Sequence, residues 1–395
     1  MRKTERLYYH DCYLREFDAR ILAAEPEPRG LRVYLDRSAF YPDSGGQPSD
    51  RGTLGGIPVL DVIDEGDALA HILECRPEGE RVSGQIDWTR RFDHMQQHTG
   101  QHILSAALEK IGGYKTISFH LGSEISTIDL DSDRLGRRQL DEAEELANRV
   151  VFENREVRIL FKSAGDAGQM DLRKPTEREG EIRVVEVLDF DRSACGGTHV
   201  NRSGAVGLIL ARKFERMKGW TRVEFLCGGR ALAAARADFA TLSEAARRFS
   251  AALENVPALI NKQTEELRAA LRIREKLIKR LAEYEARELW AAAPERDGRK
   301  IVRSVFAAED ADEARMLAHR IAHQAAAAAL IGVKGKPATL FFAQTPGGPA
   351  DMGSVLKQTV AKFGGKGGGS RDFAQGGGLD EAKLEEALAF AESLL

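Results

Sequence analysis

The feature that most constrains the fold is an apolar repeat between residues 230 and 295. Apolar side chains recur there every three or four positions, first at Leu232, Ala235, Phe239, Leu242, Ala246, Phe249 and Leu253, and then at Ile260, Leu267, Leu271, Ile278 and Leu281. This spacing predicts helices with a heptad seam. Asn255 and Pro257 interrupt the repeat like a cap and a first helical turn. We therefore expect two helices in an antiparallel hairpin, whose seam pairs either within the chain or with a second copy in a homodimer.

The residues before this repeat fall into two parts. In residues 1–90, short apolar runs at 19–24, 31–35, 59–63 and 68–73 are separated by Gly, Pro, Asp and Ser, which predicts the strands of a small β-barrel. From Asp93 to Ile111 the apolar period is helical, and Gly112-Gly113 ends it. An α/β block follows, with strands expected at 116–121, 124–130, 157–161, 182–190, 205–214 and 221–227 and a helix at 142–153.

The last hundred residues alternate between the two periods. They predict strands at 300–307 and 337–343 and helices at 310–330, 352–363 and 379–395, which together make a small α/β domain. Glycines cluster between the last two helices, at 364–369 and 376–378.

Composition excludes several classes of protein. No apolar run approaches the roughly 20 residues that a membrane-spanning helix needs, and the N-terminus lacks an apolar signal core. The four cysteines are too sparse for a disulfide scaffold. We therefore expect a cytoplasmic protein that makes no membrane contact. The net charge of −3 argues against a globally basic nucleic-acid coat but leaves room for a local basic patch.

Histidines form three pairs at a spacing of four residues: His94/His98, His98/His102 and His319/His323. Residues four apart lie on one face of a helix and can share a zinc ion. The residues between His98 and His102 are Thr99-Gly100-Gln101, and without a glutamate there a zinc protease loses its general base.

A second motif completes a ligand set. The turn Cys195-Gly196-Gly197-Thr198-His199 offers a thiolate and an imidazole after a predicted strand. We predict a zinc site formed by His98, His102, Cys195 and His199, with His94 as a substrate-side or capping residue. His319 and His323 have no nearby cysteine, and we expect them to be ordinary helix residues.

Three segments together resemble one family. Residues 90–104 resemble the first zinc motif of alanyl-tRNA editing domains, residues 193–199 the second, and residues 39–50 the glycine-rich barrel loop. The hairpin and the Gly-rich domain are similar to the C-terminal domain of alanyl-tRNA synthetase, which DHH-type phosphoesterases share. The resemblance covers nearly the whole chain. Since nothing precedes the barrel, we expect the aminoacylation domains to be absent, as in long-form AlaX-type proteins that edit in trans.

The resemblance implies an α+β fold in four parts. These are a β-barrel at 1–90, a zinc-containing editing domain at 91–228, a helical hairpin at 229–295 and a Gly-rich α/β tRNA-binding domain at 296–395. The implied reaction is hydrolysis in trans of tRNA(Ala) mischarged with serine, or with glycine, without ATP. Two other functions are weighed against it: a non-catalytic, zinc-stabilised tRNA-binding module, and a phosphoesterase-related enzyme, although the chain lacks an Asp-His-His segment.

Six residues, four of them polar and two of them glycines, are the expected substrate contacts near the motifs. They are Gln101, Thr198, Thr127, Gly45, Gly46 and Gln47, with Ser118 and His120 as weaker candidates. A pocket that hydrogen-bonds the serine hydroxyl discriminates against alanine. Asp93 and Asp129 are unconvincing bases, so no catalytic residue is assigned. A zinc with three protein ligands and an open position would be catalytic, whereas four ligands make a closed site.

The Gly-rich tail is the expected tRNA-binding surface. Six basic residues (Lys334, Lys336, Lys357, Lys362, Lys366 and Arg371) face only Asp351 across this stretch, a local charge of +5. Glycine amides permit close approach to phosphates. We expect tRNA contacts from Lys366, Gly367, Gly368, Gly369 and Arg371. A flexible linker is the alternative for residues 364–369.

Overall fold

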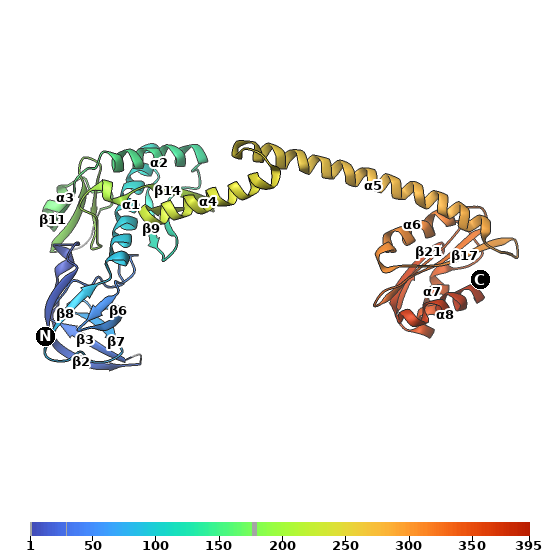
Figure 1. Ribbon diagram of the computed structural model, residues 1–395, viewed down its shortest axis with the longest axis horizontal. Helices are drawn as coiled ribbons and strands as arrows, with labels where there is room; N and C mark the ends of the chain where they lie inside the picture. The colour runs from blue at the N-terminus through green and yellow to red at the C-terminus, as the bar shows by residue number, and fades with distance from the viewer. Residues whose placement is uncertain (1, 29, 176–179) are drawn as a thin grey trace. The chain divides into compact units, whose positions relative to one another are not determined.

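The computed structural model describes residues 2–28, 30–175 and 180–395. The chain divides into two compact units, Met1–Ala245 and Ala246–Leu395 (Figure 1). Unit 1 contains the barrel, the α/β block and most of the first long helix. Unit 2 contains the second long helix and the C-terminal domain. None of the helices in the described ranges has the length and hydropathy needed to cross a bilayer.

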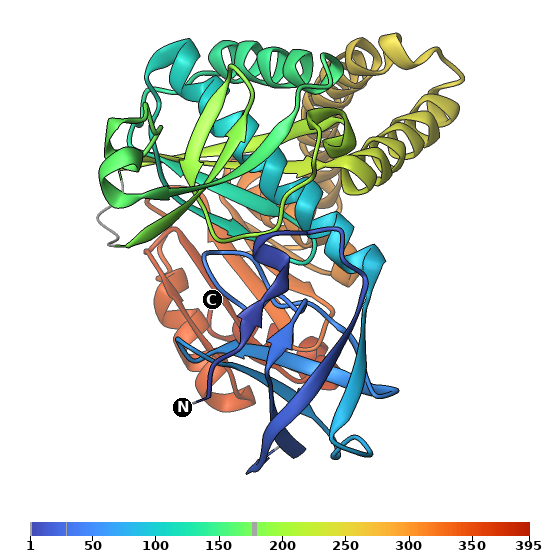
Figure 2. The same ribbon diagram turned by 90° about the vertical axis from the view of Figure 1, so that its left-hand side faces the viewer.

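The N-terminal part of unit 1 is a closed barrel, which confirms the predicted fold of residues 1–90. Its strands follow the order β2 (Glu16–Glu27), β3 (Gly30–Leu35), β7 (Leu69–Leu73), β6 (Ile57–Asp64), β5 (Gly52–Leu54) and β8 (Arg81–Ile86). The short strands β1 (Glu5–Arg6) and β4 (Arg37–Ser38) pair beside it. Figure 2 shows the barrel in blue, with helix α1 leading from the barrel into the α/β block.

Helix α1 spans Trp88–Gly112 and carries the histidine motif. The Asp87 side chain caps it by accepting a hydrogen bond from the backbone N–H of Arg90, and Gly113 ends it in the left-handed conformation, with φ +70°. The helix therefore begins five residues before the predicted start. His94 lies inside the helix, so the expectation that it caps the N-terminus is wrong.

Two antiparallel sheets flank α1 in the rest of unit 1. One has the order β14 (Ile209–Met217), β15 (Trp220–Cys227), β10 (Ser126–Leu130) and β9 (Thr116–Leu121); the other is β11 (Val157–Ser163), β12 (Glu181–Val187) and β13 (Asp191–Ala194). Helix α2 (Arg137–Phe152), the short α3 (Ala164–Gln169) and a 3-10 turn at Ser203–Val206 complete the block. In the middle of α1, Met95 and all residues from Gln97 to Leu108 are buried. The core of this block therefore surrounds the middle of the helix.

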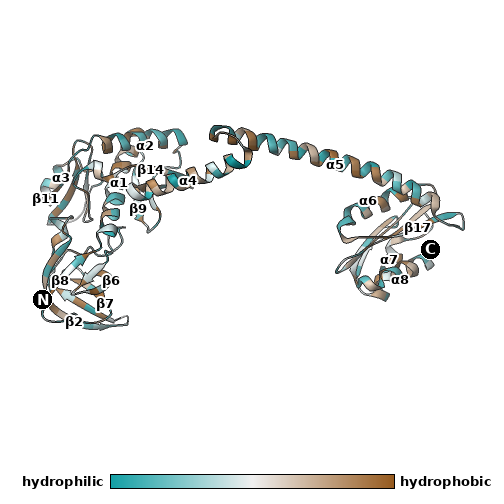
Figure 3. Ribbon diagram, viewed as in Figure 1, coloured by the Kyte–Doolittle hydropathy of each residue, from teal (hydrophilic) through white to brown (hydrophobic). Residues whose placement is uncertain are grey.

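The apolar repeat forms two long helices, α4 (Gly228–Phe249) and α5 (Val256–Ala292). Figure 3 shows apolar residues interspersed with polar ones along both. The seam side chains Leu232, Phe239 and Leu242 of α4, and Ile260, Leu267 and Leu271 of α5, are exposed within their own units. The two helices are as predicted, and their pairing into a hairpin remains a prediction.

Unit 2 ends in a six-stranded mixed sheet with helices. The strand order is β16 (Glu295–Arg296), β17 (Arg299–Phe306), β18 (Ala327–Val333), β19 (Ala338–Gln344), β21 (Phe373–Leu379) and β20 (Lys366–Gly369). The helices are α6 (Ala311–Ala322), α7 (Met352–Phe363) and α8 (Leu384–Ser393). The α/β character of the domain is as predicted.

Two boundaries in unit 2 were predicted wrongly. Residues 327–330 belong to the fully buried strand β18 and not to the preceding helix, because alanines in an interior strand lack the alternation that marks a half-buried one. Residues 366–369 and 373–379 form a β-hairpin, although glycine is disfavoured in strands. The flexible-linker alternative for the Gly-rich segment is therefore wrong, and α8 begins at Leu384 instead of at residue 379.

Candidate metal centre and adjoining cavity

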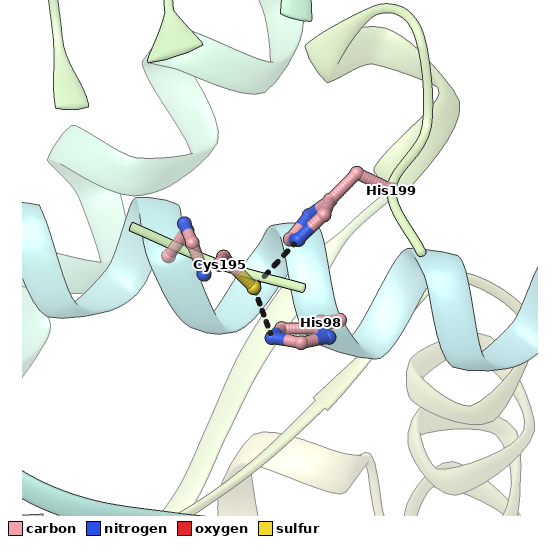
Figure 4. Close-up of side chains that lie close together, drawn as sticks. His98, Cys195 and His199 are labelled. Carbon is pink, nitrogen blue, oxygen red and sulfur yellow. Dashed lines mark hydrogen bonds between the residues drawn. The ribbon is translucent and has the colours of Figure 1, made fainter. Parts of the chain in front are cut away.

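Four side chains from two elements converge in unit 1. His98 and His102 lie one turn apart on α1, Cys195 follows β13, and His199 ends the glycine turn. One donor atom from each lies within 4.8 Å of all the others. Cys195 Sγ is 3.4 Å from Nε2 of His98 and 3.3 Å from Nε2 of His199 (Figure 4). These separations are close to the edge of about 3.5 Å expected for a tetrahedral zinc site with one thiolate, so the residues fit a metal ion.

Each histidine is held through its other ring nitrogen. Nδ1 of His98 donates to Gln47 Oε1 at 2.8 Å, and Nδ1 of His199 lies 3.1 Å from Thr99 Oγ1. Nδ1 of His102 lies 3.3 Å from Asp191 Oδ2, at ion-pair distance but without hydrogen-bond geometry. Such contacts fix ring orientation and leave Nε2 for a metal.

Hydrogen bonds from a neighbouring strand hold the glycine turn in place. Arg183 of β12 donates from Nη1 to the carbonyl oxygens of Cys195 and Gly197, at 2.7 and 3.0 Å. The backbone N–H of Gly197 donates to Cys195 Sγ at 3.4 Å. These bonds hold the backbone of the turn in place. Because the Cys195 side chain is short, the backbone of the turn also sets the position of its thiol.

The neighbouring imidazoles alter the ionisation of Cys195. Burial raises the pKa of the Cys195 thiol, but the interactions with His98 and His199 and the hydrogen bond from His102 outweigh burial and set its pKa well below the ordinary value. Burial lowers the pKa of His199 to about 3. Burial also acts to lower the pKa of His102, but Asp191 and Cys195 raise it to about 9. The group therefore favours a thiolate, which is the form that binds metal.

A cavity of about 530 Å³ opens onto these donors. Its lining includes His98, His102 and Cys195, the aromatic residues Tyr8, Tyr9, Tyr41 and Phe119, and the basic residues Arg6, Arg173 and Lys174. Within the described chain, Asp64 is the one carboxylate of the lining. Both of its oxygens accept hydrogen bonds from Arg6, at 2.6 and 2.7 Å. Although burial opposes the shift, Arg6 holds the pKa of Asp64 below its ordinary value, so this carboxylate is a poor proton acceptor.

Three of the polar residues expected from the sequence line the cavity: Gln101, Gly45 and Ser118. Gln101 donates from Nε2 to Ser105 Oγ at 2.8 Å, while its Oε1 is buried and has no hydrogen-bond partner among the described residues. An unpaired buried oxygen is costly unless a ligand satisfies it. Because Gln101 also lines the cavity, this oxygen is a candidate for ligand recognition.

Other expected substrate contacts lie next to the cavity, and their contact with substrate stays a prediction. Gln47 and Thr198 are fully buried and bond to each other, with Gln47 Nε2 donating to Thr198 Oγ1 at 2.9 Å. Gly46 adopts φ +80°, and a Cβ there would lie 2.9 Å from the carbonyl oxygen of Phe119, so only glycine fits the loop against β9. Their proximity to the site is as predicted, but they support it from outside the cavity.

The remaining candidates lie outside the lining described for this cavity. Thr127 and His120 pair across β10 and β9, and His94 is buried inside α1. Asp93 is ion-paired with Arg230, and Asp129 with Arg222. Whether either aspartate acts as a base stays a prediction.

Four residues that contact the metal-site side chains or the glycine turn, directly or through Asp191, were not predicted from the sequence: Thr99, Asp191, Arg173 and Arg183. Thr99 lies between the two histidines and Asp191 precedes Cys195 by four residues, so the motifs themselves pointed to both. Arg173 and Arg183 come from other segments, and no local pattern marks them.

In unit 2, the second histidine pair lies at the C-terminal end of α6, and the expectation that both are helix residues holds for His319, whereas His323 is the C-cap. The His319 ring stacks on Phe373 with centroids 4.0 Å apart, and His323 Nδ1 bonds to the His319 carbonyl at 2.8 Å. In the Gly-rich hairpin, Lys366, Gly367 and Gly369 of β20 are exposed, and Arg371 follows in the turn. A concavity of about 430 Å³ is lined by Arg315, Lys366, Gly376 and Gly377 and by other residues of α6, β19 and β21.

Comparison with known proteins agrees with this geometry. The model of the threonyl and alanyl tRNA synthetase second additional domain matches residues 182–224, which include Cys195 and His199. The DHHA1 domain model matches residues 297–395.

Three known proteins are similar to this chain over different shares of their length. The alanyl-tRNA editing protein AlaX-L of Pyrococcus horikoshii is 33% identical over 403 aligned residues, which cover 97% of this chain and 96% of that protein. The alanyl-tRNA editing protein Aarsd1 of Danio rerio is 34% identical over 239 residues, 56% of this chain and 58% of that protein. The alanine–tRNA ligase of Pyrococcus abyssi is 32% identical over 416 aligned residues, and this chain spans 44% of its length. The chain therefore belongs to the AlaX-L family of alanyl-tRNA editing proteins.

Proposed function

We propose that this chain is a trans-acting deacylase that hydrolyses the aminoacyl ester of mischarged tRNA(Ala), with the seryl ester as its main substrate and the glycyl ester as a second. Membership in the editing family supports the reaction class. The observation that carries the proposal is the cavity of about 530 Å³, which is lined by three of the four donor residues and by Gln101, whose Oε1 is unpaired. We also propose that the protein acts in the cytoplasm.

Zinc is the metal that we propose for the site. One thiolate and three imidazoles form a donor set typical of zinc. His98, His102, Cys195 and His199 would hold it, and Gln47, Thr99 and Asp191 would orient the imidazoles. When bound, zinc supplies Lewis acidity and a fixed positive charge beside the cavity.

Gln101 is proposed to select the substrate. Its Oε1 accepts the hydroxyl proton of a seryl group, whereas an alanyl or a glycyl group leaves this oxygen buried and unpaired, so the glycyl ester is proposed as the poorer of the two substrates. A missing hydrogen bond of this kind can separate two substrates by several orders of magnitude. Arg173 and Lys174 at the cavity supply positive charge for the phosphates near the tRNA 3′ end.

Unit 2 is proposed to hold the body of the tRNA. The exposed glycines of β20 present backbone without side chains, and Lys366 and Arg371 add charge on either side. The concavity beside them is lined by a further cation, Arg315, and by one carboxylate, Asp312. Phosphates can approach such a surface closely.

Turnover decides between this function and a non-catalytic tRNA-binding module. Purified protein is incubated with Ser-tRNA(Ala), Gly-tRNA(Ala) and Ala-tRNA(Ala), and the release of amino acid is followed. The proposal requires many turnovers on the seryl ester and sparing of the alanyl ester. Binding without release of serine would support the module.

A further inference from the structure

Helix α5 carries four basic side chains at a spacing of four residues: Arg268, Arg272, Lys276 and Arg280. Residues at this spacing lie one above the next, so the four form a row along one face of the helix. The row extends over about 18 Å. All four residues are exposed, whereas Ala282 and Ala286 further along the helix are buried. We call these four residues the basic row.

Charge is concentrated at the basic row. Between Arg268 and Arg280 there are six basic residues and one acidic residue, Glu275, which gives a net charge of +5 in a chain whose total is −3. Like charges four residues apart destabilise an isolated helix. Helix stability therefore gives no reason for three successive like-charged pairs.

Three carboxylates on α5 close to the basic row are ion-paired with other cations. Glu275 pairs with Lys279, and Glu283 pairs with Arg320 of α6. On the same helix, Lys262 pairs with Glu266. Within the described ranges, no ion pair or side-chain hydrogen bond involves a member of the basic row. The row thus presents four uncompensated charges in single file.

We infer that the basic row binds the phosphate backbone of RNA and is a second tRNA contact, separate from the Gly-rich hairpin. This inference rests on the proposed function for the identity of the RNA. Three of the four residues are arginines, whose planar guanidinium groups bind phosphate oxygens in pairs. A single file of cations along a straight helix matches the linear array of charges on a nucleic-acid strand.

The test compares two variants with the same change in charge. One is R268Q/R272Q/K276Q/R280Q, in which glutamine keeps a high helix propensity. The control is R137Q/R138Q/K262Q/K279Q, which removes four exposed cations that have carboxylate partners. Each protein is titrated with uncharged tRNA(Ala) at several salt concentrations and with vesicles of anionic lipid. Circular dichroism and thermal unfolding verify that each is folded.

The inference predicts at least a tenfold loss of tRNA affinity for the row variant at low salt, and little loss for the control. Because each lost phosphate contact lowers the slope of log affinity against log salt by about 0.7–0.9, that slope falls by about three units. Equal affinities and slopes for the two variants would overturn the inference, as would a loss confined to vesicle binding. Since the wild-type chain is assayed separately for Ser-tRNA(Ala) hydrolysis, failure of the proposed function is a distinct result.

Discussion

Asp191 Oδ2 lies 3.3 Å from Nδ1 of His102, and the other oxygen of the same carboxylate accepts a 2.7 Å hydrogen bond from Nε of Arg173. Asp191 thus connects a cation in the lining of the cavity to a residue of the candidate metal centre. The Asp191 side chain is fully buried, and although burial opposes the shift, His102 and Arg173 hold its pKa below the ordinary value. The carboxylate is therefore ionised where it faces the imidazole.

Replacing Asp191 by asparagine should weaken metal binding. The variant keeps the size of the side chain but removes the charge that orients His102, and losses of roughly 10- to 100-fold are typical for such partners. Zinc affinity is measured by competition with a chromophoric chelator. Asp189→Asn is the matched control, because Asp189 has a φ of +57° that asparagine also tolerates. Equal zinc affinities for the two variants would contradict the role of Asp191.

Alanine substitutions at the two glycines of the Cys-Gly-Gly-Thr-His turn should have very different effects on zinc affinity. A Cβ at Gly197 would lie 2.2 Å from Cε1 of His98, whereas at Gly196 the nearest atom is Tyr9 Oη at 3.5 Å. Gly197→Ala should therefore displace the His98 imidazole and lower zinc affinity by at least about tenfold, and Gly196→Ala should leave it nearly unchanged. The same competition assay decides. If the two variants bind zinc equally, the geometry of the turn is wrong.

Gln101→Met should reduce selectivity for serine. Methionine has a similar size but offers no oxygen to the serine hydroxyl, so kcat/KM on Ser-tRNA(Ala) should fall by about 10- to 100-fold. The value on Gly-tRNA(Ala), which has no hydroxyl, should change much less. Thr127→Val serves as the control, since Thr127 is outside the described lining of the cavity. A parallel loss on both esters would assign Gln101 a purely structural role.

The barrel should lose stability in acid through His71. Ser38 Oγ and the Val33 carbonyl bond to its two ring nitrogens at 2.7 and 3.0 Å, and burial lowers its pKa to about 4. Below the unfolded value near 6.5, the unfolded chain binds a proton that the folded chain does not. The contribution of His71 to stability should therefore fall by roughly 3 kcal/mol as the pH drops from about 6.5 to 4, and this contribution should stay constant below that range.

Chemical unfolding at a series of pH values checks this prediction. His94 and His199 also have lowered pKa values, so the informative quantity is the difference between proteins. His71→Asn should flatten the dependence relative to wild type, whereas His323→Gln, at an exposed position, should not. The prediction fails if His71→Asn retains the wild-type slope.

The parts predictable from sequence are those with a local signature. The barrel strands alternate with Gly and Pro turns, and the histidines repeat at the helical period, so the barrel, α1 and the four metal-site residues were all predictable. Strand β18 was missed because an alanine-rich segment that is buried on both faces has no alternation and a high helix propensity.

The supporting residues were harder to predict because they act across the fold. The bonds of Gln47 to His98 and Thr198, which are 51 and 151 positions away in the chain, were not predicted. Arg183 reaches the glycine turn from the strand beside it. Such contacts depend on how strands register in the folded unit, which no local spacing specifies.

The most direct test of the account is single-turnover hydrolysis of Ser-tRNA(Ala) by the zinc-loaded chain, compared with Cys195→Ala and with His319→Gln/His323→Gln. The account predicts rapid release of serine by the wild type, sparing of Ala-tRNA(Ala), and full activity in the His319/His323 double variant. Cys195→Ala should lose both zinc and activity, because it removes the thiolate at the centre of the donor group. Intact Ser-tRNA(Ala) with the wild-type protein, or hydrolysis by Cys195→Ala at the wild-type rate, would contradict it.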